Sequence, residues 1–128
     1  MKGVHNFTAA SDQFKLALYD NSASFTAATT AYTSSNEISG TNYTAKGNFL
    51  TSVTPVASST TAFTDFADEV FSTVTISAVR GALIFNEAAT SDPTVCVLDF
   101  GADKAASSGD FTIVFPTADA SNAIIRIA

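Results

Sequence analysis

Residues 14–20 carry the sequence Phe-Lys-Leu-Ala-Leu-Tyr-Asp, in which large apolar side chains recur at every second position. Phe14, Leu16 and Leu18 share one face of this stretch, and Lys15 belongs to the opposite face. A period of two is typical of a β-strand that buries one face. We therefore expect a half-buried strand over residues 14–20.

The same reasoning predicts further strands in the second half of the chain. Thr73–Val79 and Asp110–Phe115 also alternate with a period of two. Three other stretches are apolar on both sides, which is typical of strands covered on both faces: Gly81–Phe85, Val95–Phe100 and Ala123–Ile127.

Turn-forming residues separate these strands. Residues 86–93 bridge two of them, Ala105–Asp110 contains Ser-Ser-Gly, and Pro116 ends another, because proline cannot donate a hydrogen bond to a strand ladder. The strands recur roughly every 8–14 residues, a spacing that favours an all-β sandwich or barrel over βαβ units. We expect one antiparallel all-β domain over residues 14–128, preceded by an extended N-terminal arm over residues 1–13.

Two segments between residues 21 and 71 are less regular. Asn21–Ser35 consists almost entirely of Ser, Thr and Ala around two aromatic residues, and we expect a long loop with about one helical turn. Asp65–Phe71 is a second candidate for a short helical turn, since its acidic residues suit a helix N-terminus.

Composition limits the classes of partner. The 128 residues (13.2 kDa) carry a net charge of −6, and only six are Lys or Arg. Binding to nucleic acid or to an anionic membrane requires a surplus of basic residues, so we expect neither partner. The start of the chain lacks the apolar stretch of a signal peptide, and no window approaches the ~20 apolar residues of a membrane span.

The search for chemistry finds no catalytic, cofactor or metal site, and we expect a protein that is not an enzyme. Cys96 lies in an apolar run and is expected to be a buried, inert thiol. His5 lies in a terminal segment that is poorly suited to catalysis. Asp65, Asp68 and Glu69 cluster in sequence, but without EF-hand spacing they indicate a solvated acidic turn.

Two structural expectations concern the basic residues and one glycine. Gly81, inside an apolar stretch, is expected to mark a β-bulge or a close approach of two backbones. Arg80 and Arg126 are candidate partners for Asp99 or Glu87 at a strand edge.

Several strings, taken in order, carry a resemblance to a family: Phe14–Tyr19, Thr30–Thr33, Glu37–Thr44 with Gly47, Arg80–Asn86, Val97–Gly101, Phe111–Pro116 and Ala123–Ala128. Together they resemble a family of small, largely uncharacterised proteins encoded among the structural genes of tailed bacteriophages. The family pattern has glycine where Asn42 and Lys46 stand here. Asn tolerates a left-handed backbone, whereas Lys46 leaves the conformation of its turn open.

The resemblance implies a virion structural protein with a jelly-roll or similar β-sandwich, and among such proteins a capsid decoration or cement protein. It further implies a dimer or trimer that binds the major capsid protein on the outer shell, after synthesis in the cytoplasm of the host bacterium. The N-terminal arm is a candidate docking segment.

Two alternatives stay open. In the first alternative, the protein is a tail or fibre-attachment component. In the second it is a carbohydrate-binding module that uses Tyr19, Tyr32 and Tyr43 as aromatic platforms, although tyrosines also commonly line turns and strand edges.

Overall fold

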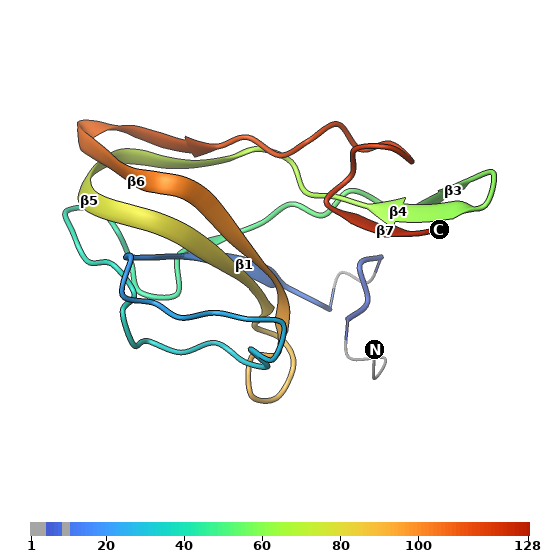
Figure 1. Ribbon diagram of the computed structural model, residues 1–128, viewed down its shortest axis with the longest axis horizontal. Helices are drawn as coiled ribbons and strands as arrows, with labels where there is room; N and C mark the ends of the chain where they lie inside the picture. Colours follow the sequence, from blue (N-terminus) through green and yellow to red (C-terminus); the bar gives the residue numbers. More distant parts are fainter. Residues whose placement is uncertain (1–4, 9–10) are drawn as a thin grey trace.

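The computed structural model describes residues 5–8 and 11–128, and every regular element within them is a β-strand (Figure 1). The strands are β1 (Phe14–Tyr19), β2 (Asn48–Phe49), β3 (Val56–Ser58), β4 (Thr61–Thr64), β5 (Glu69–Asn86), β6 (Thr94–Ile113) and β7 (Ile125–Ile127). One sheet has the order β2-β1-β5-β6 and the other the order β3-β4-β7, and all pairs are antiparallel. The predicted antiparallel all-β architecture is confirmed.

Strand β1 forms where the period of two predicted it, but both of its faces are buried. Leu16 pairs with Ile84 of β5 and packs in the main core, on the same face as Phe14 and Leu18. Tyr19, on the other face, is only 1% exposed, because Phe25 from the following loop packs over it. The prediction of a half-buried strand is therefore wrong on this point.

Four of the predicted strands merge into two. Thr73–Val79 and Gly81–Phe85 both lie within β5, and Val95–Phe100 lies within β6 together with most of Asp110–Phe115. The turn predicted at Ala105–Asp110 is wrong, since these residues continue strand β6. Its Ser-Ser-Gly sequence forms a bulge, not a chain reversal, because β5 runs alongside and holds the hydrogen-bond ladder together.

Bulges bend this long β5–β6 ribbon back on itself. The register between the two strands shifts five times, and Ala78, Gly101 and Ser108 adopt positive φ angles of 55°, 74° and 49°. Phe100 and Phe111 have ring centroids only 6.3 Å apart, whereas eleven residues of straight strand would span roughly 36 Å. The two halves of the ribbon thus form two layers around the main core (Figure 1).

Both helical turns expected from the sequence are absent from the described residues. The loop over 21–35 contains turns and an isolated bridge from Ala31 to Pro93. In the second segment, Asp65 accepts hydrogen bonds from the backbone N–H groups of Phe66 and Ile124, and β5 begins at Glu69. None of the described residues forms a helix long and apolar enough to cross a membrane.

The described part of the N-terminal segment is attached to the domain. The Phe7 ring stacks on Phe14 at 4.7 Å between centroids and packs against the main core. Asp12 accepts hydrogen bonds from the Asn6 backbone and from the Asn86 side chain. Residues 1–4 and 9–10 of the expected arm lie outside the described residues.

Candidate functional site

Two of the three tyrosines considered as sugar platforms bind one carboxylate, and the third lies beside them. Tyr32 donates its hydroxyl to Glu37 Oε2 at 2.5 Å, and Tyr43 donates to Oε1 of the same side chain at 2.8 Å. The Lys46 backbone N–H donates to Oε1 as well, at 2.7 Å. Tyr19 donates to the Thr33 carbonyl nearby, at 2.6 Å. We call these residues the tyrosine cluster; nothing in the sequence spacing indicated that they meet.

The environment of the tyrosine cluster favours neutral phenols. Burial, followed by the negative charge of Glu37 or a hydrogen bond to it, raises the pKa of Tyr19 and Tyr32 well above the usual range. Burial also raises the pKa of Tyr43, and the Leu18 backbone N–H that donates to its hydroxyl offsets only part of this effect. Tyr19 is buried, and the rings of Tyr32 and Tyr43 pack against Phe85 and Phe71, so the three rings do not form an exposed platform for a sugar.

Lys46 connects the tyrosine cluster to a row of surface charges. Its Nζ lies 2.8 Å from Asp92 and 3.6 Å from Glu87, and Glu87 in turn lies 3.4 Å from Lys15. The hydrogen bond to Asp92 is the main cause of a raised Lys46 pKa. Lys46 and Asn42 have φ angles of 72° and 61°, so both positions where glycine was expected adopt the left-handed conformation.

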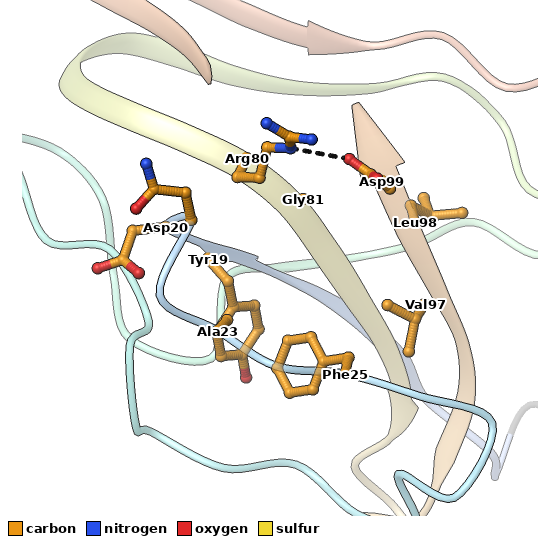
Figure 2. Close-up of a pocket in the computed structure, with 10 residues that line it drawn as sticks. Tyr19, Asp20, Ala23, Phe25, Arg80, Gly81, Val97, Leu98 and Asp99 are labelled. Atoms are coloured by element: carbon orange, nitrogen blue, oxygen red, sulfur yellow. Dashed lines mark hydrogen bonds and ion pairs between the residues drawn. The ribbon is translucent and has the colours of Figure 1, made fainter. Parts of the chain in front are cut away.

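An open cleft of about 350 Å³ lies between the loop after β1 and the β5–β6 ribbon (Figure 2). Phe25 packs edge-on against Tyr19 at 4.6 Å on one side, and Arg80 pairs with Asp99 at 3.0 Å on the other. The Gly101 N–H, and then Arg80, lower the pKa of the Asp99 carboxyl. This confirms Arg80 as a partner of Asp99, although both side chains are exposed.

Gly81 stands at the floor of this cleft, and the structure confirms the expected role. A Cβ atom at this position would lie 2.4 Å from the Leu98 carbonyl oxygen, and the β5–β6 register shifts immediately before it. Arg126, the other basic residue expected to pair with Asp99 or Glu87, instead donates to the Ser121 carbonyl.

The three acidic residues that cluster in the sequence, Asp65, Asp68 and Glu69, have separate structural roles. Asp65 is fully buried and binds two backbone N–H groups, so the expectation that it lies in a solvated turn is wrong. Asp68 accepts from the Phe115 backbone, and Glu69 accepts from the Asn48 side chain. Among the residues that the structure describes, no three potential metal ligands form a group.

His5 and Cys96 line one cavity of about 580 Å³. The cavity lies between β6 and the small sheet, and its walls are mostly apolar, with Phe7, Phe63 and Ile125 among them. Burial, and then the charge of Asp65, raises the pKa of the Cys96 thiol to about 11. This agrees with an inert thiol, because a thiol of such pKa is almost entirely protonated at neutral pH. The side chain is only partly buried, however, and not buried as expected.

Comparison of the chain with models of protein families, with curated proteins and with solved structures finds no match.

Proposed function

We propose that this protein is a non-enzymatic structural protein of a tailed-bacteriophage virion, with a jelly-roll-like fold, that decorates and stabilises the outer capsid shell. The proposal starts from the resemblance carried by the strand motifs between Phe14 and Ala128. Its partners are the major capsid protein and other copies of the same chain, in a dimer or trimer.

The small sheet is the observation that carries this proposal. Its outer strands, β3 and β7, each pair with β4 on one side only, and they lie with the C-terminus at the end opposite the bend of the ribbon (Figure 1). Val56 on β3 is 50% exposed and Ile127 on β7 is 57% exposed. Exposed strand edges with apolar side chains favour pairing with another chain.

Two further features favour a binding role, one at this end of the molecule and one at the bend of the β5–β6 ribbon. His5 and Phe7, from the expected docking arm, line the same cavity as residues of β4 and β7, so the arm and the small sheet lie side by side. The surface between Gly101 and Gly109 exposes mainly Ala, Ser and Gly, which desolvate at little cost. Contacts of this kind gain strength when symmetry repeats them over a shell.

A pelleting assay tests the proposal. Capsids that lack the protein are mixed with it and sedimented, and the bound copies per capsid are counted together with the capsid melting temperature. We expect saturation at tens to hundreds of copies and a rise in melting temperature. Absence of the protein from the pellet would refute capsid decoration and favour tail or fibre attachment.

A pair of variants locates the contact. Val56→Lys places a charge on the small sheet, and we expect it to weaken capsid binding at least tenfold, because the contact would bury that charge. Val114→Lys is the matched control, since Val114 is 73% exposed but lies outside the small sheet. Equal binding of both variants would show that the small sheet is not the contact.

The carbohydrate alternative predicts a different result. Because the tyrosine rings are buried or packed against other rings, a sugar would have to use Phe25 and the polar residues of the cleft in Figure 2. A panel of oligosaccharides would then raise the melting temperature of the free protein. We expect no such shift.

A further inference from the structure

We propose that the folded chain cleaves itself at the peptide bond between Asp92 and Pro93 in mild acid, and that it does so faster than the unfolded chain. This bond lies in the connection between β5 and β6, and no other aspartate of the sequence precedes a proline. The reaction is one of the chain with itself, without a second substrate. The proposal does not rest on capsid binding.

The chemistry follows from the two residues at the bond. A carboxylate oxygen of Asp92 attacks the carbonyl carbon of the same residue and closes a cyclic anhydride. The bond to the Pro93 nitrogen breaks, and this nitrogen leaves as a secondary amine with a proton from the acidic solvent. Water then opens the anhydride and leaves a free α-carboxyl group on Asp92. The net reaction is hydrolysis: it consumes one water, and nothing is oxidised or reduced.

The backbone before this bond is strained. Asp92 has a φ of 45° and Ser91 a φ of 69°, so two successive residues other than glycine adopt the left-handed conformation. A residue before proline is restricted further, to extended conformations, because its own backbone meets the proline ring. Cleavage of the bond removes this restriction, and strain that is released on reaction lowers the barrier.

Hydrogen bonds hold both sides of the bond. The Tyr32 backbone N–H donates to the Asp92 carbonyl oxygen at 2.9 Å. This oxygen gains negative charge when the carboxylate attacks, and a donor that is already in place stabilises that charge. On the other side, the Pro93 carbonyl accepts from the Asn86 backbone N–H at 3.0 Å, and Pro93 forms an isolated bridge with Ala31. The reacting groups are therefore held in position before the reaction begins.

The charged neighbours leave one oxygen of the Asp92 carboxylate available. Lys46 Nζ lies 2.8 Å from Oδ2, and Glu87 lies 3.6 Å from the same nitrogen. The nearby Tyr32 phenol has a raised pKa and stays neutral in acid. Among the described residues, none donates a hydrogen bond to Oδ1 of Asp92. Asp92 and Pro93 are only partly buried, so water reaches the bond.

A comparison of the folded with the unfolded chain tests the proposal. The full-length protein is incubated at about pH 5 with and without a denaturing concentration of urea, and the products are measured by mass spectrometry. We expect the fragments 1–92 and 93–128, whose summed mass exceeds that of the intact chain by one water. The folded chain should yield them at least about tenfold faster, the factor that release of one left-handed residue supplies.

Two variants provide matched controls. Thr54→Asp creates a second Asp-Pro bond, before Pro55, at an exposed position without a positive φ. In the folded variant we expect the bond before Pro93 to break at least about tenfold faster than the bond before Pro55, and in urea we expect similar rates. Asp92→Asn preserves the size of the side chain but removes the carboxylate, and we expect its cleavage to slow at least about tenfold.

Three results would overturn the proposal. Cleavage of the folded chain at the same rate as the unfolded chain, or more slowly, would show that the fold does not promote the reaction. In the folded Thr54→Asp variant, equal rates before Pro55 and Pro93 would exclude a contribution from the strained backbone. Undiminished cleavage of Asp92→Asn would exclude the carboxylate as the nucleophile. None of these results bears on the capsid assay.

Discussion

Gly47 adopts a left-handed backbone, with φ of 65°, directly against strand β1. A Cβ atom at this position would lie 1.8 Å from the Leu16 carbonyl oxygen, a distance that no side chain tolerates. Gly101 has a similar φ of 74°, but nothing lies within 4 Å of its Cβ position. A side chain at Gly101 would therefore meet only the penalty of the left-handed backbone. A side chain at Gly47 would meet that penalty and a steric clash as well.

We predict that Gly47→Ala lowers the free energy of unfolding by about 3 kcal/mol, because it adds a steric clash to the left-handed penalty. Gly101→Ala meets only the left-handed penalty, and we expect it to lower the free energy of unfolding by about 1 kcal/mol. Urea denaturation of both variants measures the difference. Equal losses would mean that the backbone of β1 moves aside for the added methyl group.

A second prediction at this scale concerns Asp65. Asp65→Ala leaves the N–H groups of Phe66 and Ile124 without their acceptor, and we expect a loss of about 3 kcal/mol. Asp68→Ala removes one hydrogen bond, to Phe115, from an exposed position and should cost about 1 kcal/mol. If Asp65→Ala is the milder change, the buried carboxylate is not a stabilising group.

At the scale of elements, the bend in the β5–β6 ribbon creates the core. Straight strands of this length would carry Phe100 and Phe111 far apart, whereas bulges bring both halves over the same apolar cluster. The bend includes residues that are not glycine but have positive φ angles, Ala78 and Ser108. Their strain is held in place by the packing on either side.

Ala78 provides the test of this strain. Because its side chain is exposed and its φ is 55°, Ala78→Gly should raise the free energy of unfolding by up to about 1 kcal/mol. Ala105 is also exposed, lies on β6 and has no positive φ, so Ala105→Gly should lower the stability by about 0.5–1 kcal/mol. Thermal unfolding of the two variants measures both changes. A stability change of the same sign in both would contradict strain at the bend.

At the scale of the whole molecule, buried weak acids make stability depend on alkaline pH. The folded state holds the pKa of the Cys96 thiol at about 11, above the ordinary value near 9. Folding also raises the pKa of Tyr19, Tyr32 and Tyr43 above the ordinary value of 10. Above these ordinary values the unfolded chain loses protons that the folded chain retains, so stability is full below them and falls as pH rises.

We therefore predict that the free energy of unfolding declines from about pH 9 upward and declines more steeply past about pH 10. Cys96→Val should remove the first part of the decline, between pH 9 and 11, and Tyr43→Phe should make the second part shallower. Urea titrations at a series of pH values check both. A stability that stays constant from pH 8 to 11 would contradict this account.

Much of the β-structure follows from local pattern. The period of two between Phe14 and Tyr19 predicts β1. The lone glycine at position 81 predicts a bulge or a close approach of two backbones, and the structure shows that the neighbour is Leu98. The pairing of Arg80 with Asp99 is one of several pairings that the sequence left open, and the structure shows it. These features depend on residues that are adjacent along the chain or belong to neighbouring strands.

The sites did not follow from the sequence, because their members lie far apart along the chain. Tyr19, Tyr32 and Tyr43 meet only because Glu37 is held opposite Tyr19 by an isolated bridge. His5 and Cys96 share a cavity only because the N-terminal segment packs beside β6. No spacing rule relates residues that are more than ninety positions apart.

The sequence by itself determined an all-β, acidic chain with antiparallel strands, because alternation and turn chemistry act over a few residues. Only the tertiary structure decided that two long strands bend where a turn was expected, that both faces of β1 are buried, and that an apolar cavity forms beside the small sheet. The physical reason is that bulges, burial and cavities depend on which segments pack together. Local propensity gives way wherever that packing stabilises another arrangement.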